Sequence, residues 1–259
     1  MFEIVDCSDK HCCGKTAVII DEQCLVEALA LILVQEYVVA RNLVSGENAD
    51  VLQPNLTAGE IDKIVSKRLK QTKYHRDGLL FQLMMWLCSH ADRDDRDLIS
   101  IPHTQGAAKG QDGLIIHRSV SEVVSLTICE DKATEHPRRT IRGDVWPEIQ
   151  KYETGERDDE LRSLLISTLG TDGVSMDEAL ACIRGVSWSG NRRYRVRITV
   201  PKNGRTKDLF KGFSGAVQGA NPLLRRGDTI EFQNLRRWMT DISSKVEKEL
   251  KKFVVVDNV

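Results

Sequence analysis

Two apolar, β-branched runs that lie close together in the chain constrain the fold more than any other feature. They cover residues 114–118 and 122–129, and the connection Ser119-Val120-Ser121 is only three residues long. Runs of this composition predict β-strands, and a connection of this length predicts that the two strands form a hairpin. We therefore expect two neighbouring antiparallel strands near the middle of the chain.

Charged residues stand at the same end of both predicted strands. Asp112 precedes the first run, and Glu130-Asp131-Lys132 follows the second. Because side chains alternate along a strand, Glu130 and Lys132 share one face, and Asp112 is expected on that face of the neighbouring strand. Carboxylate oxygens are the ligands that Mg²⁺ and Mn²⁺ prefer, and the backbone carbonyl of Asp131 is a further expected ligand.

This set of side chains is suited to the hydrolysis of a phosphodiester. A bound metal ion activates a water molecule and polarises the phosphoryl oxygen. Lys132 is expected to orient the water or to stabilise the developing negative charge. A carboxylate from a helix packed beside the strands would complete the metal site, and we expect Asp77 in this role, with Glu60 as the second choice.

The pattern Asp112-x17-Glu130-x-Lys132 on a predicted hairpin resembles the PD-(D/E)xK nuclease superfamily. The resemblance covers residues 74–153, where the sequence predicts a helix, three strands and another helix. It implies an α/β fold with a restriction-endonuclease-like mixed sheet flanked by helices. It also implies metal binding by Asp112 and Glu130 and a catalytic role for Lys132, although Gln111 replaces the proline found in the family motif.

A second resemblance concerns the residues around the same motif. Gly110-x-Asp112-Gly113 and the run from Cys129 to Thr134 are similar to the nuclease subunits of Hachiman-type anti-phage defence systems. This resemblance implies a helicase or ATPase partner protein and a DNA target. The Gln-x-x-x-Tyr pattern of RecB-like nucleases is not reproduced, because Gln150 and Tyr152 are only two positions apart.

The remaining sequence predicts further helices and strands around this core. Thr57 is expected to cap a helix through Glu60 at the third helical position. The predicted helices cover residues 22–41, 57–70, 74–89, 138–153, 156–169, 175–184 and 229–253, and the other predicted strands cover 98–103 and 193–200. We expect a nuclease-like domain over residues 1–190, with its core at about 74–153, and a basic α+β C-terminal extension over 191–259 that packs on it.

Charge is distributed unevenly along the chain. Residues 191–259 carry 16 Lys and Arg against 7 Asp and Glu, whereas residues 1–190 carry 21 against 31. A basic segment next to an acidic body indicates where a polyanion such as DNA would bind. The residues expected to contact nucleic acid are Arg138, Arg139, Arg192, Arg193, Arg195, Arg197, Lys202 and Arg205.

Two other classes of protein are disfavoured by the sequence. The apolar run at residues 24–40 contains Glu27, Gln35 and Glu36, which argues against a membrane span, and a cytoplasmic location is the default expectation. Gly14-Lys15-Thr16 resembles the end of a phosphate-binding loop, but Asp9 occupies the position where that motif requires glycine.

The leading hypothesis is therefore a metal-dependent DNA nuclease, the effector of a bacterial anti-phage defence system that acts with a helicase or ATPase. The alternative is a non-catalytic nucleic-acid-binding or assembly subunit with a nuclease-like fold. A third possibility is a protein interaction module in which Asp112 and Glu130 only form salt bridges.

Overall fold

The two apolar runs form adjacent antiparallel strands in a computed structural model of the chain. The structure describes residues 1–46, 54–103, 112–119, 123–177, 179–180, 191–219 and 221–254. Strand β4 (Gly113–Arg118) pairs with β5 (Val123–Lys132), with Gly113 opposite Cys129 and Ile116 opposite Leu126. The pairing of these two strands confirms the predicted hairpin.

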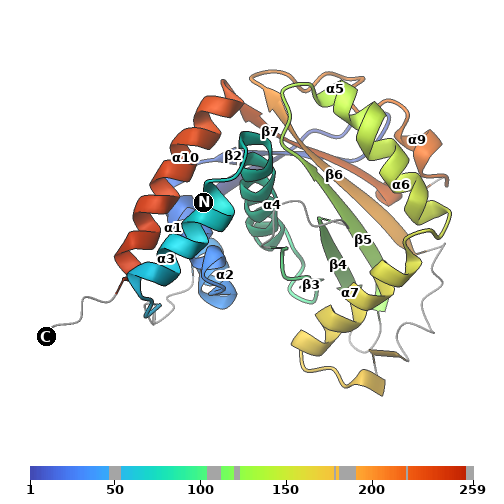
Figure 1. Ribbon diagram of the computed structural model, residues 1–259. Helices are drawn as coiled ribbons and strands as arrows, with labels where there is room; N and C mark the ends of the chain where they lie inside the picture. The colour runs from blue at the N-terminus through green and yellow to red at the C-terminus, as the bar shows by residue number, and fades with distance from the viewer. Residues whose placement is uncertain are drawn as a thin grey trace, which may run out of the picture.

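This hairpin is part of a seven-stranded mixed sheet in the order β1-β2-β7-β6-β5-β4-β3 (Figure 1). Strands β3, β4 and β5 are antiparallel neighbours, β5, β6, β7 and β2 run parallel, and β1 is antiparallel to β2. The remaining strands are β1 (Phe2–Asp6), β2 (Lys15–Ile19), β3 (Leu98–Ile99), β6 (Arg192–Pro201) and β7 (Arg225–Phe232).

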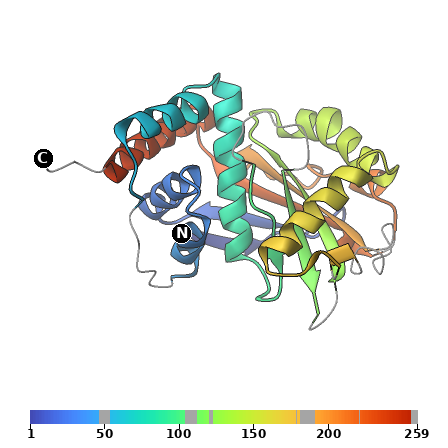
Figure 2. The same cartoon turned by 60° about the horizontal axis from the view of Figure 1, so that its bottom comes forward.

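Helices cover both faces of the sheet (Figures 1 and 2). One group consists of α1 (Glu22–Leu33), α2 (Tyr37–Ser45), α3 (Ala58–Ile64) with the π-helix η1 (Val65–Leu69), α4 (Lys73–Ala91) and α10 (Leu235–Leu250) with the 3-10 turn η4 (Lys251–Phe253). The other consists of α5 (Pro137–Thr140), the π-helix η2 (Ile141–Val145), α6 (Trp146–Glu153), α7 (Asp158–Thr171), α9 (Phe213–Ala216) and the 3-10 turn η3 (Pro222–Leu224).

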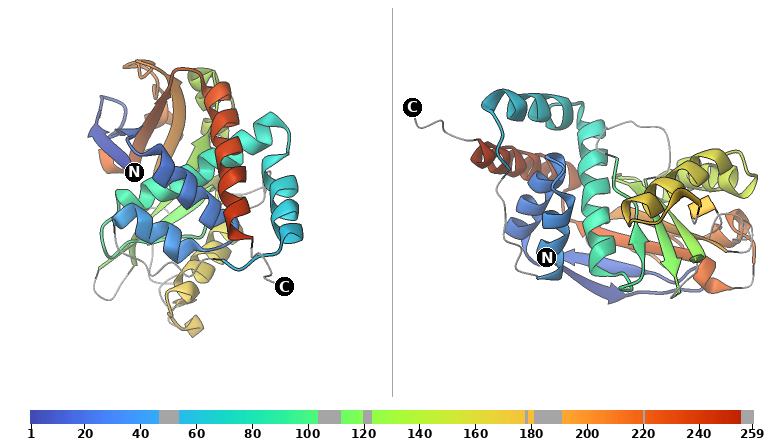
Figure 3. Two further views of the ribbon diagram at one scale, coloured as in Figure 1. Left: turned by 90° about the vertical axis from the view of Figure 1, so that its left-hand side faces the viewer. Right: turned by 90° about the horizontal axis from the view of Figure 1, so that it is seen from below.

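Each face of the sheet has its own hydrophobic core. Ile230 and Phe232 pack with α1, α4 and α10 on the first face, where the helices from the two ends of the chain lie side by side (Figure 3). Leu126, Ile128 and Tyr194 pack with α6 and α7 on the second face. Because Leu126 and Ile128 of β5 enter the second core and the residues between them face α4, the face on which each side chain at the end of that strand lies is fixed.

Several predicted helices are confirmed. The predicted capping box is present at the start of α3, where the side chain of Thr57 accepts a hydrogen bond from the backbone N–H of Glu60 and the side chain of Glu60 accepts one from the backbone N–H of Thr57. The helix predicted at 22–41 is divided into α1 and α2, because the chain turns through Gln35 at φ 69°. Half of the helix predicted at 175–184 lies outside the described residues, and within the described part residues 176–177 and 179–180 are helical.

The helix predicted at 229–253 is wrong in its first part. β7 occupies residues up to Phe232, and α10 begins only at Leu235, after Asn234 accepts a hydrogen bond from the backbone N–H of Arg237. Both faces of β7 are covered, so its residues show neither the alternation of an exposed strand nor a clear helical stripe. Strands β1 and β2 were not predicted either.

The expected division at residue 190 does not correspond to a boundary in the sheet. The segment from residue 191 supplies β6 and β7, which lie at the centre of the sheet between β5 and β2. β6 and β7 are therefore strands of the same sheet as the predicted core, and they do not form an extension that packs on its surface.

A buried ion pair joins the two central parallel strands to α4. The guanidinium of Arg197 on β6 donates to both carboxylate oxygens of Asp131 on β5, at 2.5 and 2.7 Å, and to the carbonyl oxygen of Met85 at 2.7 Å. It also donates to the hydroxyl of Ser89. The side chains of Arg197 and Asp131 are only 3% and 1% exposed, so neither charge has access to water as a substitute partner.

Replacement of Arg197 by methionine is expected to destabilise the protein by about 3–5 kcal/mol, because it leaves the carboxylate of Asp131 buried and unpaired. Urea denaturation followed by circular dichroism measures this change. Arg237→Met is the matched control, because Arg237 is 82% exposed and lies 3.9 Å from Asp241, and we expect a change below about 0.5 kcal/mol. Equal stabilities of the two variants would contradict this role for Arg197.

Candidate functional site

Asp112, Glu130 and Lys132 lie together at one end of the β4 and β5 pair. Glu130 and Lys132 follow Leu126 and Ile128 on the face of the sheet that α6 and α7 cover. The Nζ atom of Lys132 donates to Oε1 of Glu130 at 2.5 Å and lies 3.9 Å from Oδ2 of Asp112. The structure thus brings together the two carboxylates and the ammonium group that the sequence pattern singled out.

Backbone contacts hold Asp112 next to the end of β5. Its Oδ2 atom accepts a hydrogen bond from the backbone N–H of Asp131 at 2.7 Å. Its carbonyl oxygen accepts one from Nε2 of Gln82 on α4 at 2.9 Å. A hydrogen bond from β5 therefore holds the carboxylate of Asp112, and a hydrogen bond from α4 holds its backbone.

The turn after Lys132 is held by a set of threonine side chains. The backbone N–H of Thr134 donates to the hydroxyl oxygen of Thr199 at 2.8 Å, and that hydroxyl donates to the carbonyl oxygen of Thr134 at 2.7 Å. The Thr134 hydroxyl also lies 2.9 Å from that of Thr140 on α5. These bonds tie the end of β5 to β6 and to the following helix, which keeps Lys132 in place.

The site is partly shielded from water, and this shielding shifts the pKa values of its acids. Glu130 is 7% exposed, whereas Asp112 and Lys132 are 23% and 32% exposed. Burial and the neighbouring charge of Glu130 raise the pKa of Asp112 to about 7. Burial also raises the pKa of Glu130. The structure therefore holds two carboxylates whose negative charge is poorly compensated at neutral pH.

Lys132 supplies the positive charge nearest to these acids. Burial by itself would lower the pKa of Lys132, but the charges of Glu130 and Asp112 outweigh burial and raise it. The lysine is therefore protonated at neutral pH. It acts as an ammonium donor at this site and not as a general base.

The other two acids expected at the metal site are engaged elsewhere. The side chain of Asp131 lies on the opposite face of β5, where burial raises its pKa to about 6 and Arg197 binds both oxygens. Asp77 is completely buried, with Oδ1 bonded to Arg76 at 2.7 Å and Oδ2 to Arg236 at 2.6 Å. Glu60 serves in the capping box. Because Arg197 binds both side-chain oxygens of Asp131, its backbone carbonyl oxygen is the remaining metal ligand expected from that residue.

One acid near the site was missed in the sequence. Glu148 on α6 contributes to the raised pKa of Glu130, and Tyr152 on the same helix is also influenced by Glu130. Glu148 is bonded to Lys151 at 2.9 Å and to Arg157 at 2.6 Å. The four-residue spacing of Glu148 and Tyr152, which places both on one side of a helix, was the signal that could have identified them.

Several of the basic residues expected to contact DNA are buried, and for these the expectation is corrected. Arg192 donates to Asp158 at 2.6 Å, and Arg195 to Asp228 at 2.6 Å, and the two arginine side chains are only 6% and 4% exposed. Arg197 is paired with Asp131 as described above. β6 is confirmed as a strand. Its basic face packs under α4, where the positive charges are neutralised by aspartates on the neighbouring strands and at the end of α4.

The remaining basic residues differ in exposure. Arg205 donates to the carbonyl oxygens of Gly227 and Cys7 at 2.8 and 2.9 Å, and Arg138 to that of Leu209 at 3.1 Å. Arg139 and Lys202 are exposed, and Arg193 is half-buried.

The structure also bears on two other sequence motifs. Gly14 stands at the start of β2, where a Cβ atom would lie 2.2 Å from the carbonyl oxygen of Gly227, so this glycine permits close packing of two chain segments. A strand follows it, whereas a phosphate-binding loop leads into a helix. None of the helices in the described ranges is both long and apolar enough to span a bilayer.

Comparisons with protein-family models and with curated proteins found no match to this chain. Within the described residues, no group of three or more His, Cys, Asp and Glu side chains is arranged to hold a metal ion. Among the residues that the structure describes, Asp112 and Glu130 are therefore the carboxylates that could bind a cation at the site, with water or substrate completing its coordination.

Asp112→Asn is expected to stabilise the metal-free protein at pH 8 by roughly 1–3 kcal/mol. The raised pKa of Asp112 means that folding favours its protonated form. The ionised carboxylate of Asp112 therefore destabilises the wild-type protein increasingly as the pH rises from about 4 to about 7, and fully above pH 7. Denaturation in a chelating buffer at pH 5 and pH 8 measures the effect, which should shrink at pH 5. Asp241→Asn, on the surface of α10, is the control. A stabilisation of Asp112→Asn that does not change with pH would contradict the assignment.

Proposed function

We propose that this protein is a metal-dependent nuclease that hydrolyses phosphodiester bonds in DNA. The observation that carries the proposal is the convergence of Asp112 and Glu130, two poorly compensated carboxylates, with the ammonium group of Lys132 at one end of a strand pair. Raised acid pKa values next to a fixed lysine are typical of a catalytic site and are uncommon in a surface salt bridge.

The donor set fits Mg²⁺ or Mn²⁺. Both residues offer hard oxygen ligands, and a divalent cation would relieve the repulsion that raises the pKa of Asp112. Asp112 has one oxygen, Oδ1, that is not used by the backbone N–H of Asp131, and Glu130 has one oxygen, Oε2, that is not used by Lys132. Asp77 does not suit a ligand role in this arrangement, because arginines bind both of its oxygens.

Each of the three residues has a distinct task in the proposed reaction. A bound cation supplies an activated water molecule and polarises the scissile phosphate. Asp112 and Glu130 hold the cation, and the backbone N–H of Asp131 orients the Asp112 carboxylate. Lys132 donates from its ammonium group toward the oxygen atoms on which negative charge develops. The threonine bonds around Thr134 keep that donor in position.

The order of elements supports a restriction-endonuclease-like assignment of the fold. A helix, α4, is followed by the antiparallel strands β3, β4 and β5, then by the helices α5 to α7, and then by β6 parallel to β5. The helix, three strands and following helix are the elements that the resemblance to the PD-(D/E)xK superfamily implies, with Asp112 just before β4 and with Glu130 and Lys132 at the end of β5.

The DNA substrate and the partner are part of the same proposal. Arg139 and Lys202 remain exposed and available to phosphates, and a location in the cytoplasm suits this target. The resemblance to Hachiman-type nucleases adds a helicase or ATPase partner and a role in defence against phage. Partner control would suit the proposed activity, because an unrestrained nuclease is toxic to its host.

Glu130→Gln and Lys132→Met are expected to reduce metal-dependent DNA cleavage by at least about a hundredfold, because the first weakens the binding of the cation and the second removes the donor to the developing negative charge. Cleavage of labelled linear and circular DNA with Mg²⁺ or Mn²⁺ is the measurement, with and without a cognate ATPase. Glu247→Gln and Lys245→Met are matched controls that carry the same side-chain changes at salt bridges on α10, far from the site in the chain. Full activity of either site variant with an intact fold would refute the proposal.

Mn²⁺ binding should release protons near neutral pH, because the cation displaces the proton that Asp112 holds with its pKa of about 7. Titration calorimetry in two buffers of different ionisation enthalpy measures the protons released, and the affinity should rise between pH 6 and pH 8. This experiment needs no partner protein. Binding that is independent of pH and unchanged in Asp112→Asn would count against the metal site.

The second candidate function is a non-catalytic nucleic-acid-binding or assembly subunit with the same fold. The observation that favours it is the direct bond between Lys132 and Glu130, which gives the site a closed salt bridge without a cation. Salt-sensitive DNA binding without cleavage under any metal condition, in the presence of the partner ATPase, would support this alternative.

A further inference from the structure

A second polar site lies on the opposite face of the sheet from Asp112, Glu130 and Lys132. It is a cavity of about 170 Å³ between the C-terminal end of α4, the first half of β6 and the start of β7. The residues that matter for its chemistry are Asp92, Arg93, His117, Arg193, Arg195 and Arg226. Arg193 and Arg195 project to the α4 side of β6, whereas Tyr194 between them packs in the other core.

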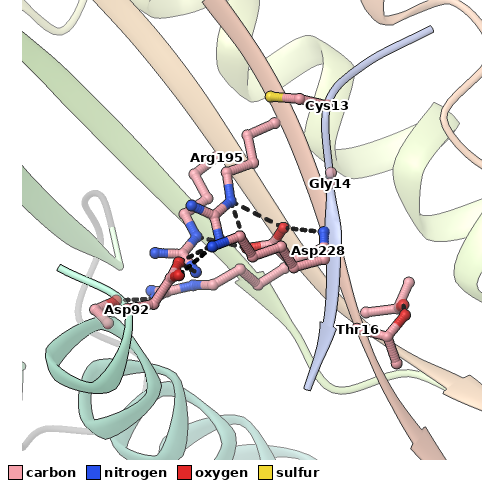
Figure 4. Close-up of polar contacts among 12 residues, drawn as sticks. Cys13, Gly14, Thr16, Asp92, Arg195 and Asp228 are labelled. Atoms are coloured by element: carbon pink, nitrogen blue, oxygen red, sulfur yellow. Dashed lines mark hydrogen bonds and ion pairs between the residues drawn. The ribbon is translucent and has the colours of Figure 1, made fainter. Parts of the chain in front are cut away.

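Cationic side chains outnumber carboxylates in and directly beneath this cavity. Asp92 bonds to Arg195 at 3.2 Å and also to Arg226 and Lys15, and Asp228 bonds to Arg195 at 2.6 Å and to Arg226 at 2.9 Å (Figure 4). Despite the opposing effect of burial, these arginines keep the pKa of Asp92 and of Asp228 below their usual range. Both carboxylates are thus ionised and fully used by this network.

Two arginines at the cavity are left outside this network. Arg93 follows Asp92 at the end of α4, and Arg193 stands two residues before Arg195 on β6. Neither has an ion-pair partner among the residues that the structure describes, and both are half-buried. A further acid that lines the cavity, Asp97, is 2.9 Å from Nδ1 of His117, whose Nε2 is 2.7 Å from the hydroxyl of Thr127.

The charge balance of the site is therefore positive. Five cations, Lys15, Arg93, Arg193, Arg195 and Arg226, face three carboxylates, Asp92, Asp97 and Asp228. An anion with a charge near −2 would balance the excess. Guanidinium groups bind phosphate oxygens through paired N–H donors, which makes arginine the residue best suited to such a ligand.

The size of the cavity limits what can bind inside it. A volume of 170 Å³ is smaller than the roughly 300–1,000 Å³ of pockets that enclose drug-sized molecules. The cavity has room for a phosphate or pyrophosphate group, and the remainder of a larger ligand would lie outside. We propose that this cavity binds a phosphate group, held by Arg93 and Arg193. The group belongs either to a small phosphorylated molecule or to the end of a nucleic acid strand.

The test uses the full chain in a low-salt buffer free of phosphate and sulfate. Three sets of probes are titrated by calorimetry: inorganic phosphate and pyrophosphate, a nucleoside 5′-diphosphate, and a short oligonucleotide with a 5′-phosphate beside its 5′-hydroxyl counterpart. Saturable binding of the first two sets identifies a small phosphorylated ligand. A preference for the 5′-phosphorylated oligonucleotide alone identifies a strand end, and either outcome supports the proposal.

Variants decide whether this cavity is the site. Arg93→Ala and Arg193→Ala are each expected to weaken binding by about tenfold or more, because each removes charged hydrogen-bond donors. Arg193→Lys should give an intermediate loss, because it keeps the charge but not the paired donors. Arg237→Ala, which changes an exposed arginine on α10, should bind as the wild type does. Circular dichroism confirms that each variant is folded.

Two results would overturn the proposal. One is the absence of saturable binding by every probe. The other is binding that Arg93→Ala and Arg193→Ala leave as strong as in Arg237→Ala, which would place the bound phosphate elsewhere on the protein.

Discussion

The buried pair of Arg197 and Asp131 is the interaction on which the arrangement of this protein depends. It joins the two central parallel strands to each other and, through Met85 and Ser89, to α4. Because Asp131 faces α4, the alternation of side chains along β5 directs Glu130 and Lys132 to the opposite face. Asp131 thus stabilises the core, and its neighbours Glu130 and Lys132 lie at the candidate site.

The electrostatic character of the candidate site follows from this placement. Glu130 lies at the edge of an apolar core formed with α6 and α7, so its charge is costly, and the carboxylate of Asp112 lies beside it. Lys132 compensates only part of the combined charge. A site of this kind is destabilised without a cation and stabilised with one, which is the physical basis of the proposed nuclease activity. Arg192, Arg195 and Arg197 of β6, which the sequence suggested as DNA contacts, act instead as internal partners of aspartates.

Local sequence information was sufficient to predict several elements of this fold. The hairpin of β4 and β5, the helix α4 and the capping box at Thr57 were predicted correctly, because each has a local signature in periodicity or capping residues. β7 was mistaken for the start of a helix, since it is covered on both faces and has no alternating pattern. Glu148 was missed, because its proximity to Glu130 arises from the packing of α6 on the sheet.

The sequence by itself determined that Asp112, Glu130 and Lys132 would stand at the same end of one hairpin, because two strand-forming runs joined by a short connection pair antiparallel and side chains alternate along each strand. Only the tertiary structure decided which charges are internal. Arg195 and Arg197 resemble a surface basic stripe when the strand is considered alone, but β6 is central, and aspartates from β5, β7 and α4 surround it. The reason is physical: burial and pairing of a charge depend on neighbours that are distant in the chain, as Arg197 and Asp131 are, and no local pattern records them.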